Sequence, residues 1–564
     1  MLKKTMYHIC DKKTVILAVT TFTAYIIYTL SLFMWCKGYY TYEDMFGPLS
    51  KNAIIAISID IFLLMSFLFL YFLSSKCDDC RKDFILSIIV IVLLITSLRI
   101  LPDVADSYYD QNFYDAGGHI VRGAFVTLTG HSDPDVDGYF DLQPAFFWVT
   151  AIFINVVYGS PASPSDPIFD FFVKWFSIIA IMIYIPTLYL SFKKYGLKKG
   201  EIYLAFFLFF SLSFGRFHYA AQTYADALFW LSLTLLFDIV MYRELKKIFM
   251  LMLIFTAVIF IHEGVTVFMI TTLISIIIAL LLSKYTKRSL FTALVLFTFF
   301  FVSWFIYLLY ISNFTLSTFT SLVIFVIKRY LSEGVSGVVS QGVYRPWRPW
   351  ENVVRFKAIY MGTLILSGTL LTVWMYKATR NNIYLFKIFV ILGVSTLIGA
   401  VAIGLGGAAY IERVPGLLLP LFSVAFVEAF KQFNNQKYVN TFRKGFIALM
   451  FFFIVSAPFV YFSGRNFQSS TYAEHYAYFY SATYSPKDSY GIYTNLNILT
   501  LNTAIMLKLS NKSIGEMYVS VPRSAIINTL YYTYGDITKI TMYVNELILE
   551  KNIVFMNSDY MLLT

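Results

Sequence analysis

The sequence is poor in charge. Only 14% of its 564 residues are Asp, Glu, Lys or Arg, whereas 58% are hydrophobic and the mean hydropathy is +0.68. A soluble globular protein of this length needs more polar surface than such a composition provides. The composition therefore excludes an ordinary soluble protein and predicts a polytopic membrane protein.

Cysteine is also scarce. Four cysteines are too few for a disulfide framework in a chain of this length. Cys77 and Cys80 form one CxxC pair without a second, so we interpret the pair as a plain loop rather than as a metal or redox site. No small-residue cleavage pattern follows the first apolar run, residues 14–35, so we expect a retained helix and not a signal peptide.

The basic residues are not arranged as in a nucleic-acid-binding protein. The formal net charge is +11, but the lysines lie in short clusters between apolar runs. Such clusters set the orientation of membrane helices. We therefore expect no nucleic-acid partner, and the positive-inside rule places these clusters in the cytoplasm: 3–13, 76–82, 193–199, 243–247, 284–288, 377–380 and 431–444.

Apolar runs recur along most of the chain, and a helix of about 20 residues crosses the hydrocarbon. After 14–35 they cover residues 53–74, 84–101, 144–158, 168–191, 201–214, 221–242, 248–261, 264–283, 289–311, 358–376, 383–410, 414–430 and 446–462. They predict an all-α fold in the cell membrane.

The count of crossings depends on one short run. If residues 144–158 form a juxtamembrane or re-entrant helix, about 13 crossings result, with the N-terminus cytoplasmic and the C-terminus extracytoplasmic. If 144–158 and 168–191 both cross, the cluster at 193–199 lies outside and every downstream face is inverted. We prefer the first topology, because it keeps all the basic clusters on one side.

The preferred topology sorts the chemically useful residues onto the outer face. It places there residues 102–143, 215–226, 262–264, 312–357 and 410–413, together with five of the six histidines. Residues 1–463 thus form the membrane domain. From residue 464 the hydropathy drops, and short alternating runs at 517–521, 540–544 and 553–556 predict a small α/β or β-rich extracytoplasmic domain, residues 464–564.

The first outer loop carries an unusual concentration of acid. Residues 101–144 hold eight aspartates, two histidines and a single arginine. Polar groups at a membrane edge are costly unless they are solvated, paired or used, so such a loop indicates a functional site. A carboxylate in it could serve as the general base that deprotonates a weak nucleophile.

The order of residues in this loop resembles a known family. An acidic residue, a short helix-compatible stretch, Thr129-Gly130-His131 and then YFDLQPAFFW before a membrane helix are similar to the first outer loop of the C-type membrane glycosyltransferases. The resemblance implies an inverting transfer of sugar from a polyprenyl-phosphate donor. It implies Asp115 as the catalytic carboxylate, with Asp110 as second choice, and His119 and His131 at the substrate.

The resemblance extends to the outer helix-end turns, as far as about residue 430. They supply the further residues that it implies at the substrate: Arg216, His218, Asp226, His262, Glu263 and Arg413. Taken singly, Arg216, His218, Glu263 and Arg413 also suit snorkelling or capping at helix ends. Both readings stay open from the sequence.

The second half of the acidic loop has the order of a calcium loop. Asp133, Asp135, Asp137 and Asp141 occupy positions 1, 3, 5 and 9, and glycine occupies position 6, although position 12 is proline. We predict a divalent cation here, Ca²⁺, Mg²⁺ or Mn²⁺, either ordering the loop or screening a donor pyrophosphate.

The second large outer loop, residues 312–357, breaks the positive-inside trend. Arg345 and Arg348 alternate there with Trp347 and Trp350. The planar guanidinium suits phosphate, and tryptophan suits a sugar face or the membrane interface. Donor-phosphate binding and anchoring to membrane lipid headgroups are both compatible with this pattern.

Together these patterns predict a membrane glycosyltransferase acting on the outer face, whose acceptor is a protein, a lipid or a glycan. The main alternative is a transporter or flippase of a lipid-linked or polar substrate. Transporters usually show internal repeats and place ionisable residues at the bilayer midplane. The sequence shows no such repeat, which favours the enzyme; a non-catalytic surface protein is the third possibility.

Overall fold

A computed structural model gives the architecture of the chain. It describes residues 108–110, 118–133, 139–159, 161, 167–212, 219–282, 287–312, 351–405, 413–435 and 444–450, single positions within 316–332 and 452–456, and residues 470–471, 490–492, 518–522, 553–556 and 560–563. The apolar runs at 14–35, 53–74 and 84–101 lie outside these residues.

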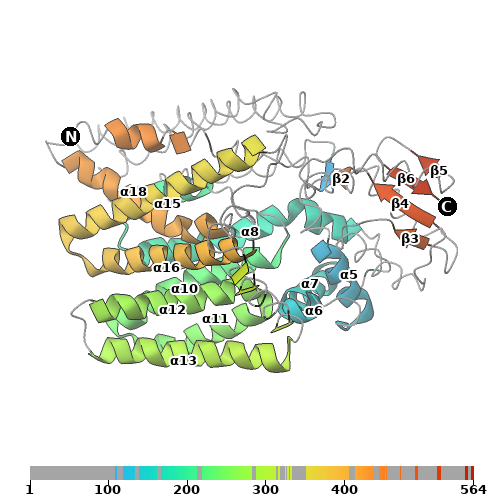
Figure 1. Cartoon of the computed structure of the whole chain (residues 1–564), viewed down its shortest axis with the longest axis horizontal. Helices are drawn as coiled ribbons and strands as arrows, with labels where there is room; N and C mark the ends of the chain where they lie inside the picture. The colour runs from blue at the N-terminus through green and yellow to red at the C-terminus, as the bar shows by residue number, and fades with distance from the viewer. Residues whose placement is uncertain are drawn as a thin grey trace, which may run out of the picture.

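The described part of the chain is dominated by helices that run roughly side by side (Figure 1). They are α5 (Gly118–Thr129), α6 (Tyr139–Leu142), α7 (Pro144–Val157), α8 (Pro167–Lys194), α9 (Lys199–Leu212), α10 (Ala221–Tyr242), the short 3₁₀ helix η3 (Leu245–Lys247), α11 (Ile248–Ile261), α12 (Glu263–Leu282), α13 (Lys287–Tyr310), α15 (Glu351–Thr379), α16 (Asn382–Leu405) and α18 (Arg413–Asn435). Where the structure describes them, the apolar runs predicted between residues 144 and 430 are helical.

Several of these helices suit a membrane. Among the described residues, five helical segments are long and apolar enough to cross: Ala221–Tyr242, Glu263–Leu282, Lys287–Tyr310, Ile359–Thr379 and Val414–Gln432. The prediction of a helical chain with membrane-spanning segments is thus confirmed in its coarse form. The helices α10 and α18 are largely buried among their neighbours, whereas α13 exposes a broad apolar face.

Aromatic and small side chains hold the bundle together. The Trp230 indole of α10 donates a hydrogen bond to the Leu417 carbonyl of α18 at 3.1 Å. Gly368 lets α15 approach α18, because a Cβ added at Gly368 would lie 2.2 Å from Cδ1 of the buried Phe422. Close backbone approach at small residues is the usual way in which membrane helices pack.

Short strands lie in the C-terminal part. β3 (Tyr490–Ile492), β4 (Tyr518–Pro522), β6 (Tyr560–Leu563) and β5 (Ile553–Met556) form a four-stranded sheet in that order. The run predicted at 517–521 overlaps β4 and the one at 553–556 coincides with β5, whereas the run at 540–544 lies outside the described residues. A second pair joins β1 (Tyr108–Asp110) to β2 (Ser470–Thr471), so the acidic loop pairs with the C-terminal region.

The two ends of the bundle differ. The helices α5, α6 and α7 gather at one end, beyond the last turn of α13 (Figure 1). At the other end lie the last turn of α8, the last turn of α10 and η3, which are joined by ion pairs of Asp238 with Lys194 and Lys247. We refer to these as the acidic-loop end and the lysine end.

Candidate functional site

The local sequence determines where α5 and α7 begin and end. α5 stops at Gly130, whose φ of 72° lies in the left-handed region and whose amide donates to the Val126 carbonyl at 2.9 Å. Pro144 occupies the first turn of α7, where its missing N–H leaves no hydrogen bond unmade. The two helices pack against each other and carry the first group of site residues.

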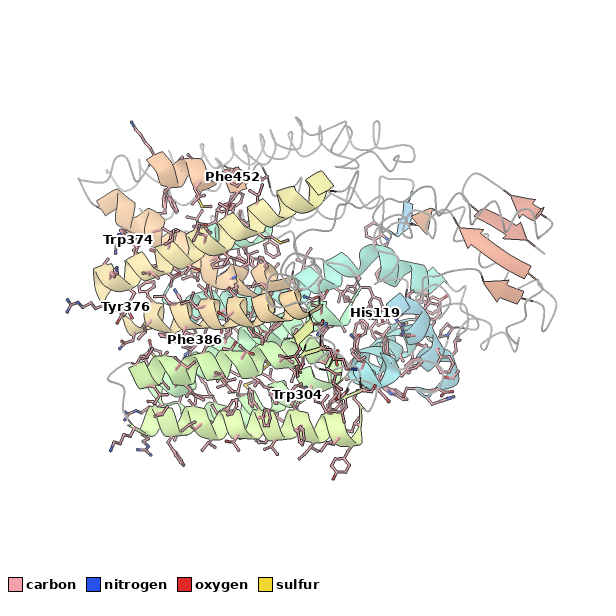
Figure 2. All side chains as sticks on the ribbon, viewed as in Figure 1. His119, Trp304, Trp374, Tyr376, Phe386 and Phe452 are labelled. Atoms are coloured by element: carbon pink, nitrogen blue, oxygen red, sulfur yellow. The ribbon has the colours of Figure 1, made fainter. Side chains whose placement is uncertain are left out.

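His119 lies in an aromatic wall at this end. Its ring centroid is 5.3 Å from Phe146, 6.0 Å from Phe147 and 6.4 Å from Tyr219, and the side chain is buried (Figure 2). Its ring contacts are therefore with α7 and with the segment before α10. His119 is the first residue after Gly118, so this wall fixes the beginning of α5.

A buried hydrogen bond joins the same elements. The hydroxyl groups of Tyr219 and Thr150 are 2.6 Å apart, and neither residue reaches water. A Cβ added at Gly123 of α5 would lie 3.1 Å from the Tyr219 hydroxyl and 3.2 Å from Thr150 Cγ2. Burial raises the pKa of Tyr219 well above its usual value, so its hydroxyl stays neutral and positions its neighbours.

Gln143 lies at the junction of α6 and α7. It precedes Pro144, its side chain is 6% exposed, and its Oε1 accepts no hydrogen bond from any residue that the structure describes. A buried amide oxygen normally has a donor. A ligand or water at the junction of α6 and α7 would supply one.

A second group of residues lies where α13, which packs against α12, meets α6. The Tyr307 hydroxyl, in the last turns of α13, donates a hydrogen bond to the Asp141 backbone carbonyl. The carboxylates of Asp141 and Glu263 both act electrostatically on Tyr307. Tyr307 therefore links the acidic loop to the first turn of α12, where Glu263 lies.

His262 has a structural role that the sequence left open. It ends α11 in an extended conformation, and its Nδ1 accepts a hydrogen bond from the Val265 amide at 3.3 Å, which caps α12. Gly264 is needed beside it, since a Cβ there would lie 3.0 Å from the His262 ring. The buried His262 thus creates the break that brings Glu263 to the site.

The other predicted residues fall into three groups. Asp226 is half-buried on α10 and acts electrostatically on Tyr184 of α8, whereas His131 is exposed after α5, with its ring 5.7 Å from Phe125. Asp110 lies in β1 and Arg413 begins α18, and nothing further is described of their side chains. Five predicted residues lie outside the described part: Asp115, Arg216, His218, Arg345 and Arg348.

The predicted cation loop is only partly covered. Asp133 and Asp141 are described and half-buried, whereas Asp135 and Asp137 lie outside the described residues. Within the part of the chain that the structure describes, no group of three His, Cys, Asp or Glu side chains could hold a metal ion. The cation therefore remains a prediction from the sequence.

Sequence reasoning missed four residues that organise this end: Thr150, Tyr219, Tyr307 and Gln143. Tyr219 and Gln143 lie within turns that the sequence placed on the outer face, so their position was predictable. Thr150 and Tyr307 lie within apolar runs, where nothing in the hydropathy distinguishes them. Comparison of the sequence with protein-family models and with curated proteins finds no match.

The lysine end holds a separate charged cluster. The carboxylate of Asp238, 1% exposed, pairs with Lys194 at 3.1 Å and with Lys247, and the outlying Glu244 pairs with Lys247 at 2.6 Å. Burial lowers the pKa of Lys247, but its hydrogen bonds to Asp238 and Glu244 raise that pKa by more, to above its usual value. Lysines predicted to set topology therefore also join α8, α10 and η3.

Asp238→Asn is expected to lower the free energy of unfolding by about 2 kcal/mol, because it weakens the charge-assisted hydrogen bonds of a buried carboxylate with two lysines, which are themselves partly exposed to water. Glu244→Gln is the matched control: it touches the same two lysines, but its side chain is 41% exposed, so a change below about 1 kcal/mol is expected. The stability of the two variants is compared by heating each protein and quantifying the remaining folded fraction by size-exclusion chromatography. Equal losses of stability would contradict the role of burial.

Proposed function

We propose that this chain is a membrane glycosyltransferase of the C-type, which transfers a sugar from a polyprenyl-phosphate donor to an acceptor at the acidic-loop end. The observation that carries the proposal is the position of α5 and α6. These two helices lie at one end of a bundle of candidate membrane-spanning helices, and Tyr307 of α13 donates a hydrogen bond to the Asp141 carbonyl of α6. A lipid-linked substrate reaches such a position from the bilayer.

The proposed reaction is an inverting displacement. An outer-loop aspartate, Asp115 or Asp110, removes a proton from the acceptor hydroxyl or amide. The acceptor then attacks the anomeric carbon, whose bond to the donor phosphate oxygen breaks, and the polyprenyl phosphate leaves with the bonding electrons. Arg216, Arg345, Arg348 and Arg413 are proposed to hold its phosphate, and a divalent cation at 133–141 to screen it.

The proposed topology has about 13 crossings, with the lysine end in the cytoplasm and the acidic-loop end outside. Residues 464–564 form an extracytoplasmic domain in this proposal. The pairing of β1 with β2 supports a contact between this domain and the acidic loop. It gives the C-terminal region a place from which it could select the acceptor.

A transporter or flippase is the second candidate, and one residue favours it. Lys387 of α16 is buried, with its Nζ 4.8 Å from the ring centroid of Tyr384 and 5.5 Å from that of Tyr195. Ionisable residues inside membrane bundles commonly mark transport pathways. Lys387 lies in the first turns of α16, however, near the lysine end and away from the middle of the helix.

One assay separates the two candidates. The full-length protein is reconstituted in proteoliposomes with a polyprenyl-phosphate donor that carries a radiolabelled sugar. The enzyme is expected to release the label from the lipid to an acceptor or to water, with inversion at the anomeric carbon. A donor that stays intact but changes leaflet supports the transporter and contradicts the proposed enzyme.

A further inference from the structure

Two buried polar residues at the acidic-loop end have no part in the reaction described above. Arg122 of α5 is 3% exposed and is the only arginine of residues 101–144. Gln143, at the junction of α6 and α7, is 6% exposed. Buried polar and charged groups are costly unless they form hydrogen bonds, so two of them among apolar side chains indicate a use.

Arg122 faces the junction of α6 and α7. Residues three positions apart form a row along the surface of a helix, so Arg122 lies between His119 and Phe125 on α5. The ring centroid of His119 is 5.3 Å from that of Phe146, in the first turn of α7. The ring centroid of Phe125 is 5.4 Å from that of Phe140, in α6. The row therefore contacts α7 on one side of Arg122 and α6 on the other.

Gln143 presents an unused acceptor at this junction. Its backbone is fixed, because its carbonyl accepts a hydrogen bond from the Phe146 amide at 3.2 Å. Its side-chain Oε1 is buried, and no residue in the described part of the chain donates a hydrogen bond to it. Asp141 and Pro144, before and after it, are partly exposed, so the amide lies directly below the protein surface.

We infer that Arg122 and Gln143 form a subsite that binds a hydroxyl group of the donor sugar. A hydroxyl group both accepts and donates a hydrogen bond, whereas a guanidinium only donates and an amide oxygen only accepts. One sugar hydroxyl therefore satisfies both residues at once. Arg122 also has an interaction within the protein, and its five N–H donors allow more than one partner.

The surroundings suit a sugar. His119, Phe146 and Phe147 form an aromatic boundary at the junction, and small-molecule sites are commonly lined by apolar rings with a few polar groups that fix orientation. The inference rests on the proposed function for its substrate. It adds two residues that select the sugar, apart from the aspartates that are proposed to act on the acceptor.

One substitution is expected to have opposite effects on stability and on binding. Gln143→Met keeps the length of the side chain but removes the amide. Because Oε1 has no donor within the described protein, its loss should raise the melting temperature measured without lipid. The same variant should bind a sugar-bearing lipid about tenfold more weakly, relative to the sugar-free lipid, because one hydrogen bond to the sugar is lost.

Native mass spectrometry of the full-length protein in detergent measures this binding. The three probes are polyprenyl-phosphate glucose, polyprenyl-phosphate mannose and sugar-free polyprenyl phosphate. The wild type is expected to prefer at least one of the two sugar-bearing lipids, and Gln143→Met to lose that preference. Arg122→Lys should reduce it, because an ammonium group keeps the charge but not the planar fork. Gln432→Met, a partly exposed position on α18, is the matched control and should keep the preference.

Three results would overturn the inference: a wild type without preference for either sugar-bearing lipid, an unchanged preference in Gln143→Met, or a lower melting temperature of that variant without lipid. The last result would mean that the amide serves packing or holds a structural water. If the wild type shows the preference but transfers no sugar in proteoliposomes, the proposed enzyme fails and the subsite stands. If it transfers sugar and Gln143→Met keeps the preference, the enzyme stands and the subsite fails.

Discussion

Gly393→Val is expected to abolish recovery of folded protein, and Gly393→Ala to lower its stability by about 3 kcal/mol. Gly393 lies on α16 where that helix packs against α12. A Cβ added at Gly393 would lie 1.5 Å from Oγ of Ser275 and 2.6 Å from its Cβ. Rotation of the Ser275 hydroxyl relieves only the first contact and breaks its bond to the Thr271 carbonyl, so the helices must separate.

Gly362→Ala on α15 is the matched control, because a Cβ added there meets no atom within 4 Å. Its effect is expected to be neutral or slightly stabilising, as alanine is the better helix former. Ser275→Gly should restore much of the stability lost in Gly393→Ala, because it removes the atoms that the new Cβ meets. Melting temperatures of the three variants are measured by heating the protein and quantifying the remaining folded fraction by size-exclusion chromatography. A Gly393→Ala protein as stable as the wild type would contradict the close approach of α12 and α16.

The limits of the helices could be predicted well from the sequence. The runs predicted at 221–242 and 248–261 coincide with α10 and α11 to the residue. Apolar segments bounded by charged turns fix such limits locally, because each backbone polar group in lipid must be satisfied within its own helix. The break at His262 was visible for the same reason, since HEG interrupts two apolar runs.

The contacts between helices could not be predicted from the sequence. α12 is buried on most sides, so its hydropathy does not reveal that Ser275 faces Gly393. Likewise, Tyr307 donates a hydrogen bond to the carbonyl of Asp141, which is 166 residues away in the sequence. The sequence shows Asp238 only as an acidic residue in an apolar run, and does not reveal its ion pairs with Lys194 and Lys247. Such pairings depend on helix rotation and order, which periodicity does not encode when every face is apolar.

The candidate site was predicted in part. The sequence singled out His119, His262, Glu263 and Asp141, and the structure places them at the acidic-loop end. Two of them have roles in packing or capping that the sequence reasoning did not predict. His119 is held among aromatic rings, and His262 caps α12.

Asp115→Asn is expected to reduce sugar transfer by about 10²- to 10⁴-fold, the usual contribution of a general base, while Asp110→Asn has a smaller effect. The substitution preserves shape but removes the basic oxygen. Asp115 lies three residues before Gly118, where α5 begins. Asp110 lies in β1, opposite Ser470, where its backbone is committed to strand pairing. The fall should appear in kcat rather than in KM, because the base acts in the transition state.

Comparison of Asp133→Asn with Asp115→Asn distinguishes a cation ligand from a catalytic carboxylate in the same loop. Asp133 follows α5, in the half of the loop that has the calcium-loop order. If that half binds a cation, Asp133→Asn should weaken activity at low divalent-ion concentration and recover when the ion is raised, whereas Asp115→Asn should not recover. If Asp110→Asn, Asp115→Asn and the double variant all transferred sugar at the wild-type rate, neither aspartate could be the proposed base. That result would leave Glu263, which lies near Tyr307 and Asp141, as the next carboxylate to replace.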